Sequence, residues 1–456
     1  MTRRLLLLII AALLGSVYSR ADDIPYRQQM REIYRQLPVK PGDIVFLGNS
    51  ITDFGLWSEF FGCDTRIINR GIQGIESPEV LEHIALIGEG HPHKLFLMIG
   101  INDFKTPERV VLNVRKMLAL MQQRSPETEL YVQSILPCNL AQRASTPTTL
   151  NPQLETLCAE MGVTYLDIFT PMTDGGTAIP AVMTCDQLHP NIFGYRLWCN
   201  VIKDAVGRDV AIDSTATSFK EPLRRPIYRS ILGTYQLLPI HENDILHVGD
   251  YQVMTGEWEE LMGMSNFKNR GCGGGYGWSL TLDEFIAASD CFIKGNPKAI
   301  FFQCGKRDLD PNTTPVDTVF TKYKTAVQHL LKLAPDADIY LESIIPNANA
   351  DVNTQSIKPF NDRMLQYVES SSNPRLHFVD VYSALAEGDV LASRYVGANT
   401  EQSRGINGRG YVRWANVLAR FVPESNPVPE MTDTEAQEWE ARWDALEKSW
   451  FNAALQ

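Results

Sequence analysis

The chain of 456 residues is too long for one ordinary hydrophobic core and fits two domains of roughly 200 residues each. Its composition, with 44% hydrophobic and 21% charged residues, is that of a globular protein. The net charge of -12 argues against nucleic acid and anionic membrane surfaces as partners, because both are bound by basic protein surfaces.

The first 21 residues have the pattern of a signal peptide. Arg3 and Arg4 form a basic start, Leu5 to Leu14 an apolar run, and Ser19-Arg20-Ala21 a small-x-small cleavage site. The apolar run is well short of the ~20 residues that span a bilayer. We therefore expect export to the periplasm or the exterior without stable membrane insertion. An uncleaved N-terminal anchor is the alternative.

The rest of the chain repeats itself. Residues 33–62, IYRQLPVKPGDIVFLGNSITDFGLWSEFFG, align with residues 234–263, TYQLLPIHENDILHVGDYQVMTGEWEELMG. Later blocks keep the same order: NRGIQG and NRGCGG, HPHKLFLMIGIND and NPKAIFFQCGKRD, SPETELYVQSILP and APDADIYLESIIP, GYRLWCNVI and GYVRWANVL. This order over nearly 200 residues indicates a duplicated unit.

Each unit alternates short apolar runs with segments of helical spacing, such as 110–123 and 151–161. The expected strands of the first unit are Ile44–Leu47, Leu95–Ile99, Leu130–Leu136 and Val163–Ile168. This alternation predicts parallel α/β sheets whose ligands bind beyond the carboxyl ends of the strands.

The predicted domain organisation follows from the repeat. It comprises a signal peptide (1–21), a first domain (22–210), a connector (211–226), a second domain (227–425) and a C-terminal helix (426–456).

The last helix begins with a capping box, Thr432-x-x-Glu435. Its Trp439, Trp443 and Trp450 recur at helical spacing. We expect them to pack on their own chain, because three exposed tryptophans would be costly, and a partner-binding helix is the alternative.

The eight cysteines are scattered, with five in the first half and three in the second. We interpret most as small buried side chains, with one disulfide at most. No Cys-x-x-Cys pair or Cys/His cluster suggests a metal site, and no cofactor is expected.

The candidate catalytic residues begin with Ser50, which follows the first strand. Asp186 precedes His189 by three residues, so its carboxylate can hold the imidazole Nδ1 and leave Nε2 facing outward. Gly71, in a predicted loop after Asn69, and Asn102 are candidate oxyanion donors. Taken singly, each motif is also typical of a turn or a helix cap.

The ordered set G-[DN]-S, N-x-G-x-x-G, G-x-N-D and D-x-x-H over residues 43–202 resembles the SGNH (GDSL-like) hydrolases. The resemblance implies a flavodoxin-like fold, a three-layer α/β/α sandwich with a parallel sheet, and with the repeat it predicts two such units in tandem. It makes Ser50 the nucleophile, His189 the base and Asp186 the residue that orients it. The oxyanion donors would be the N–H groups of Ser50 and Gly71 and the Asn102 amide. Asn49 departs from the commoner Asp, which puts the local loop hydrogen bonding in question.

The second unit resembles the family less. Tyr251 replaces Ser50, Arg307 replaces Asn102, and Gln402 and Gly405 replace Asp186 and His189. Only Gly271, the counterpart of Gly71, is kept. We interpret this unit as a degenerate copy that shapes the site or replaces a dimer partner.

Two alternatives for the second unit remain open at this point. Cys272 or Cys304 could be a new thiol nucleophile, although no histidine matches the base position. Tyr251 and Arg307 could bind an anionic or sugar group, or simply fill the former pocket.

The sequence therefore predicts an exported serine esterase for short-chain, mainly acetyl, esters, with acetylated carbohydrate as the first choice of substrate. The first unit most resembles the platelet-activating-factor acetylhydrolase-like branch. A lysophospholipase or thioesterase of the same family is one alternative, and a glycan-binding or scaffolding protein is another. The substrate would be a small-molecule or glycan ester, and the oligomeric state is undetermined.

Overall fold

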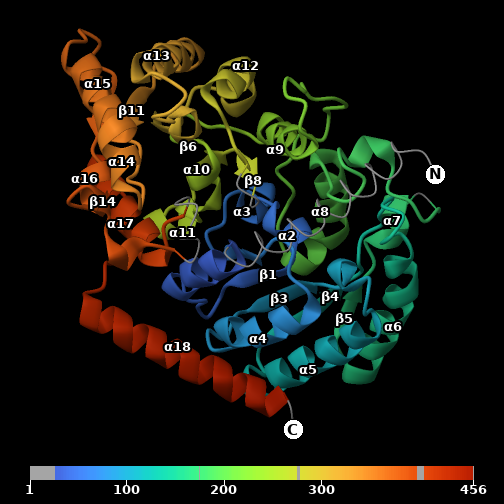
Figure 1. The fold of residues 1–456 in the computed structure, drawn as a ribbon. Coiled ribbons are helices and arrows are strands. Elements are labelled where there is room, and N and C mark those ends of the chain that lie inside the picture. The colour runs from blue at the N-terminus through green and yellow to red at the C-terminus, as the bar shows by residue number, and fades with distance from the viewer. Residues whose placement is uncertain (1–25, 174, 275–277, 398–404, 455–456) are drawn as a thin grey trace, which may run out of the picture.

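The computed structural model describes residues 26–173, 175–274, 278–397 and 405–454 (Figure 1). The predicted signal peptide and Gln402 lie outside these ranges. Within them, the chain forms two five-stranded parallel sheets with flanking helices. The two predicted parallel α/β units are thus confirmed, while the predicted domain boundaries stay predictions.

The first sheet has the strand order β2-β1-β3-β4-β5. Its strands are β1 (Ile44–Gly48), β2 (Ile67–Gly71), β3 (Lys94–Met98), β4 (Glu129–Gln133) and β5 (Thr164–Leu166). An unlabelled helix covers residues 26–36. The other helices are α2 (Ser50–Asp53), α3 (Trp57–Phe60), α4 (Ser77–Gly88), η1 (Ile101–Asp103), α5 (Glu108–Arg124), α6 (Ser145–Met161), α7 (Phe169–Thr173), η2 (Ala181–Met183) and α8 (Ile192–Val206).

The second sheet repeats this topology in the order β7-β6-β10-β11-β12. Its strands are β6 (Ile245–Gly249), β7 (Phe267–Gly271), β10 (Ala299–Gln303), β11 (Asp338–Glu342) and β12 (Leu376–Val379). Two short hairpins are β8 (Gly273–Gly274) with β9 (Trp278–Ser279) and β13 (Ala386–Glu387) with β14 (Val390–Leu391). Its main helices are α9 (Pro226–Leu237), α10 (Tyr251–Thr255), α11 (Trp258–Met262), α12 (Leu282–Phe292), α13 (Val316–Leu333), α14 (Ala350–Val352), α15 (Lys358–Glu369), α16 (Tyr382–Leu385) and α17 (Gly408–Leu418).

Strand β2 was not predicted, because the sequence places the polar pair Asn69-Arg70 where a loop was expected. The strand forms because Ile67 and Ile68 are buried against β1 and because a carboxylate of the second unit neutralises the buried Arg70. The predicted strand at 130–136 ends early at Gln133, since the Asn151 side chain binds both the N–H and the C=O of Ile135.

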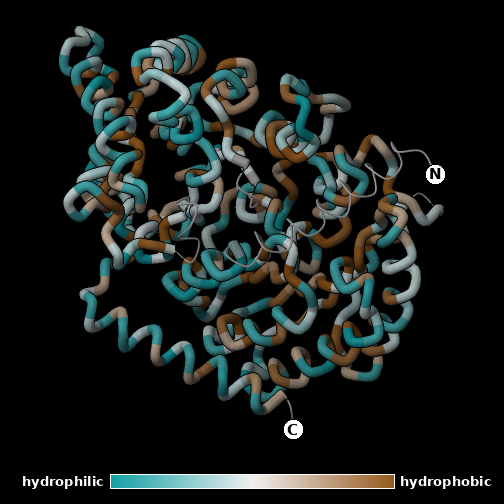
Figure 2. The backbone as a smooth tube through the Cα atoms, in the orientation of Figure 1, coloured by the Kyte–Doolittle hydropathy of each residue, from teal (hydrophilic) through white to brown (hydrophobic). Residues whose placement is uncertain are grey.

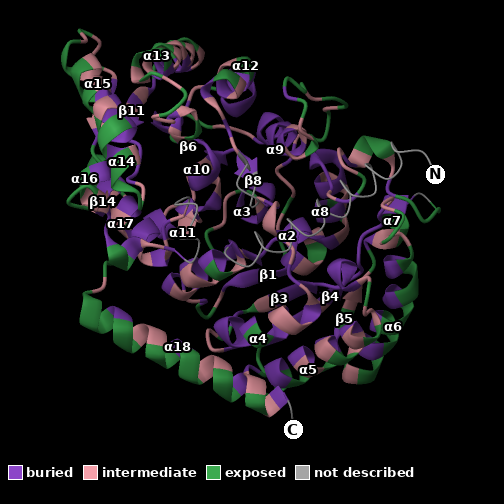
Figure 3. Ribbon diagram, viewed as in Figure 1, coloured by how far each residue is buried: buried purple, intermediate pink, exposed green. Residues whose placement is uncertain are grey.

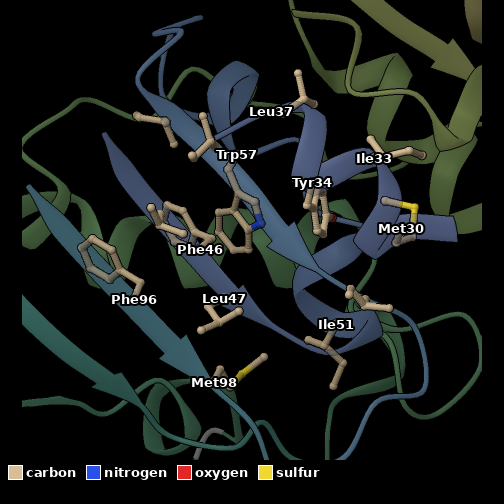
Figure 4. Close-up of a cluster of buried hydrophobic side chains, with 14 of the residues drawn as sticks. Met30, Ile33, Tyr34, Leu37, Phe46, Leu47, Ile51, Trp57, Phe96 and Met98 are labelled. Carbon is tan, nitrogen blue, oxygen red and sulfur yellow. The ribbon is translucent and has the colours of Figure 1, made fainter. Parts of the chain in front are cut away.

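The core of the first unit is built on β1, whose five residues are all buried (Figure 3). Four of the five, Ile44 to Leu47, are hydrophobic, and Figure 2 shows the hydropathy along the chain. The Phe46 ring stacks on Trp57 at 4.0 Å and on Phe96 at 4.9 Å between centroids (Figure 4). Trp57 also meets Trp198 of α8 edge to face at 4.8 Å. These contacts fix α3 and α8 against the sheet, and so set the positions of the loops that precede them.

Two reciprocal ion pairs join the units. Arg70 on β2 makes a bidentate pair with Glu260 on α11, with both N···O distances 2.8 Å. Arg270 on β7 makes the same pair with Glu59 on α3, with both distances 2.7 Å. Arg70 and Arg270 are counterparts in the repeat, and so are Glu59 and Glu260. The interface therefore has the self-complementary form of a two-fold dimer contact.

The C-terminal helix α18 (Asp433–Ala454) returns from the second unit to the first and lies along α4 (Figure 1). The Trp439 indole donates to the Arg35 carbonyl at 2.7 Å, and the Trp450 indole donates to Glu89 Oε1 at 2.6 Å. Thr432 and Glu435 exchange the predicted capping bonds. The helix packs on its own chain, as predicted.

All eight cysteines lie in the described part of the chain and are free thiols, six of them buried. No helix among the described residues has both the length and the apolar character needed to cross a membrane.

The buried ion pairs allow a stability test of the interface. Arg270→Leu should lower the free energy of unfolding by about 3–5 kcal/mol, because it leaves the Glu59 carboxylate buried without its bidentate partner. The double variant Glu59→Leu/Arg270→Leu should recover most of that loss. Urea-induced unfolding measures both, and a single variant as stable as the wild type would contradict a role for the pair in joining the units.

Candidate active site

Ser50 stands at the carboxyl end of β1, as the first residue of α2. Gly48 permits the turn, since a Cβ there would lie 2.4 Å from the Met98 carbonyl oxygen. The Asn49 side chain caps α2 by accepting the Ile51 N–H at 3.0 Å. Asp250 makes the equivalent bond at 2.9 Å in the second unit, so Asn49 preserves the local hydrogen bonding.

His189 lies within proton-transfer distance of Ser50. Ser50 Oγ is 2.9 Å from His189 Nε2, and His189 Nδ1 is 2.6 Å from Asp186 Oδ2. Because the carboxylate accepts the proton on Nδ1, Nε2 is left to accept the hydroxyl proton of Ser50. The structure thus brings together three of the predicted residues in the geometry of an activated hydroxyl nucleophile.

A tight turn holds Asp186 under the imidazole. Gln187 adopts φ +73°, which bends the chain so that Asp186 Oδ1 accepts the N–H groups of Leu188 and His189 at 3.0 and 2.7 Å. Burial favours a higher pKa for Asp186, but its hydrogen bonds and charge interaction with His189 outweigh it and lower the pKa from 3.8 to about 2. Asp186 is therefore a carboxylate at neutral pH.

Asn102 lies in η1, after the neighbouring strand β3. Its Nδ2 donates to the Ile75 carbonyl at 3.0 Å, and its Oδ1 accepts from Arg143 Nη1 at 2.9 Å. A carbonyl can only accept and a guanidinium can only donate, so these partners fix which end of the amide is nitrogen. The second Nδ2 hydrogen remains available as a donor. Arg143 was not predicted, because no local motif connects it to Asn102.

The structure does not support the predicted oxyanion role of Gly71. Gly71 ends strand β2, and its N–H already donates to Asn69 Oδ1 at 2.9 Å. Gly271 makes the same bond to Asn269 at 2.8 Å in the degenerate unit. Glycine is needed here for packing, since a Cβ on Gly71 would lie 2.3 Å from the Asp53 nitrogen. The conserved N-x-G geometry of both units is therefore structural.

Gly74, three residues further along, is better placed as a backbone donor. It adopts φ +75°, which favours glycine, and precedes Ile75, the residue whose carbonyl holds the Asn102 amide. Within the described part of the chain its N–H has no hydrogen-bond partner. Gly74 is the second glycine of the N-x-G-x-x-G motif, so the motif itself could have identified it as a candidate donor.

The corresponding positions of the second unit lack these groups. Tyr251 occupies the start of α10. Its hydroxyl lies 3.4 Å from Oε1 of Gln29, which is on the helix over residues 26–36 of the first unit. Gly405 offers no base, and Arg307 is exposed, donating to the Ser279 carbonyl. Burial raises the pKa of the Cys272 and Cys304 thiols well above the ordinary value, so neither is an activated thiolate.

Among the described residues, no group of three or more His, Cys, Asp or Glu side chains is arranged to hold a metal ion.

The model of the GDSL-like Lipase/Acylhydrolase family matches residues 46–197. The chain contains a domain of this family. The matched stretch includes Ser50, Asn102, Asp186 and His189, and ends within α8. A comparison with curated proteins gave no match.

Solved structures similar to this chain are described as a putative platelet activating factor from Streptococcus pneumonia, a putative acylhydrolase from Bacteroides fragilis and an acetylxylan esterase from Geobacillus stearothermophilus. Their sequence identities are 21%, 24% and 16%, and their TM-scores are 0.37, 0.35 and 0.31. The alignments cover 43%, 40% and 38% of this chain and 92%, 94% and 97% of theirs, respectively.

The lowered pKa of Asp186 leads to a test by acid unfolding. A carboxylate whose folded pKa is about 2, below its ordinary 3.8, stabilises the fold above pH 4 and loses that contribution as the pH falls towards 2. The stability difference between the wild type and Asp186→Asn should therefore be constant above about pH 5 and shrink below pH 4. Urea titrations at several pH values measure it, and a difference independent of pH would contradict the assignment.

Proposed function

We propose that this protein is an exported serine esterase that acts through an acyl-enzyme on Ser50. The observation that carries the proposal is the continuous hydrogen-bonded series from Ser50 Oγ through His189 to Asp186. In the degenerate unit, Tyr251 and Gly405 stand at the positions of the nucleophile and the base. Among the described residues, a serine, a histidine and an aspartate therefore stand in this hydrogen-bonded order in the first unit and not at the corresponding positions of the second.

The reaction follows from the positions of these groups. Ser50 Oγ attacks the ester carbonyl carbon while His189 Nε2 takes the hydroxyl proton. The bond to the alcohol oxygen then breaks, His189 returns the proton to the departing alcohol, and the acyl group remains on Ser50. Water next attacks the acyl carbon and gives a proton to His189, which restores the Ser50 hydroxyl as the acid leaves. Asp186 stays ionised and stabilises the imidazolium in both halves of the reaction.

The negative charge on the carbonyl oxygen requires hydrogen-bond donors that are already in place. We assign this role to the Asn102 amide and to the N–H groups of Ser50 and Gly74. Arg143 is a positioning residue, because it holds Asn102 Oδ1 and thereby turns Nδ2 towards the site.

Acetyl esters on carbohydrate are the substrate class we favour. Among the described residues, the large apolar side chains that are exposed are Leu112, Val182, Leu365 and Phe421. They lie on four separate elements, α5, η2, α15 and the short helix η6 (Ala419–Phe421), so no single element offers several exposed apolar side chains to a long acyl chain. The predicted export would give the enzyme access to extracellular glycans. A lysophospholipase or thioesterase for short or single acyl chains is the second candidate within the family.

The second unit is, in this proposal, a non-catalytic copy that takes the place of a dimer partner. The reciprocal pairs of Arg70 with Glu260 and of Arg270 with Glu59 support this role, since they repeat one contact across a two-fold relation.

Ser50→Ala should lower the hydrolysis of 4-nitrophenyl acetate by at least ~10⁴-fold, because the nucleophile is lost. Tyr251→Phe is the matched control at the corresponding position of the second unit and should retain wild-type rates. Butyrate esters and the release of acetate from acetylated glycans then define the substrate. Equal background rates for the wild type and Ser50→Ala would favour the glycan-binding or scaffolding alternative.

Asn102→Ala should lower kcat by about 10²–10³-fold with little change in KM, because its amide binds the charge that develops in the transition state. Arg143→Met should have a smaller effect of about 10-fold, since the amide remains but loses the partner that orients it. Steady-state kinetics on one acetate ester measure both variants. Wild-type kcat in Asn102→Ala would exclude the amide from the oxyanion site.

A further inference from the structure

The first helix of the second unit contacts the loop that carries His189. Ser230 on α9 donates a hydrogen bond through Oγ to the carbonyl of Pro190 at 3.0 Å, and both residues are buried. Pro190 directly follows His189 and leads into α8. A side chain from one unit thus binds the backbone next to the proposed base of the other.

The same contact occurs in the opposite direction. Gln29, on the helix over 26–36, donates through Nε2 to the carbonyl of Ile406 at 2.8 Å. Gln29 and Ser230 are counterparts in the repeat, as are Pro190 and Ile406. The first helix of each unit (residues 26–36, and α9) therefore binds a loop of the other unit. In the first unit this loop carries His189, and in the second it carries Gly405 at the equivalent position. The Gln29 amide and the Ser230 hydroxyl differ in type but make equivalent bonds. Both units therefore retain this contact between helix and loop.

The bond from Ser230 adds to the hydrogen bonds with which the first unit itself holds this loop. Within the loop, the Thr184 hydroxyl donates to the His189 carbonyl at 2.8 Å, and the Asn139 N–H donates to the Gln187 carbonyl at 2.9 Å. These bonds fix the turn over Asp186. At the junction with α8, the first unit holds Asn191 through its N–H and Nδ2, which donate to the Met183 and Val182 carbonyls at 2.8 and 2.9 Å. The preceding Pro190 carbonyl accepts its hydrogen bond from α9.

The connector strengthens the same junction. Arg196 on α8 donates to the carbonyls of Asp213 and Ala216 at 2.7 and 2.9 Å. The Phe193 ring lies 5.6 Å from Phe219, which in turn packs under Gly233 of α9. The start of α8 is thus held between its own unit and the segment that leads into the second unit.

We propose that α9 of the second unit positions the catalytic loop and that Ser230 is a positioning residue for His189. This inference rests on the proposed esterase function of Ser50. The second unit has lost the residues of its own chemistry but keeps the helix that supports its neighbour's base. The first unit keeps the equivalent contact to a loop that no longer carries a histidine.

The test compares two variants that remove equivalent bonds. Ser230→Ala should lower kcat about 3- to 10-fold on an acetate ester, the effect of one lost hydrogen bond, with KM changed less than about two-fold. Gln29→Ala, the matched control, removes the bond to Ile406 and should leave kcat unchanged. Ser230→Thr, which keeps the hydroxyl, should restore kcat. Wild-type kcat in folded Ser230→Ala, or an equal loss in both variants, would overturn the proposal.

Hydrogen exchange provides a readout that does not depend on activity. Ser230→Ala should speed amide exchange in residues 184–194 by about 5-fold, whereas Gln29→Ala should affect residues 405–411 instead. If the wild type hydrolysed no ester but these exchange changes appeared, the esterase function would fail while the contact remained. Unchanged exchange at 184–194 in Ser230→Ala would refute the positioning role itself.

Discussion

The reciprocal Arg–Glu pairs are the contacts on which the arrangement of this protein depends. Arg70 and Arg270 are almost completely buried, so each requires a carboxylate, and the carboxylate with which each forms its ion pair belongs to the other unit. Each guanidinium also lies over a tyrosine of its own unit's leading helix, Tyr34 or Tyr235, at 4.8 and 4.9 Å from the ring centre. A buried arginine without a carboxylate would destabilise β2 or β7 in an isolated unit. Pairing with the glutamate of the other unit removes this cost and fixes how the two units lie against each other.

In this arrangement the second unit contacts the first at several points besides the Arg–Glu pairs. Its leading helix lies against the loop of His189, and the connector holds the start of α8. Helix α18 adds a further link, because it begins at the end of the second unit and packs on α4 of the first.

Comparing the two units also separates chemical from structural roles. Asn49 and Asp250 cap equivalent helices, and Gly71 and Gly271 make equivalent bonds, although Tyr251 and Gly405 stand in the second unit where the first has Ser50 and His189. A residue of the same type that makes the same contact in both units, such as Gly71 and Gly271, is therefore explained by the fold. The Asn102 amide and its partner Arg143 have no such counterpart, because Arg307 stands at the position of Asn102, and this difference supports the oxyanion role proposed for the amide.

The sequence alone determined the duplication, the strands that form buried apolar runs, the capped C-terminal helix and the grouping of Ser50, Asp186, His189 and Asn102. These features depend on local patterns, or on motifs whose order is kept along the chain. Only the tertiary structure decided that β2 is a strand, that Gly71 is a packing residue, and that Arg143 and Ser230 contact the site. Each of these depends on atoms brought together from distant parts of the chain, such as the Glu260 carboxylate at Arg70 and the Pro190 carbonyl at Ser230. The spacing of residues along the sequence does not predict such contacts, because burial and charge compensation arise only when the chain is packed.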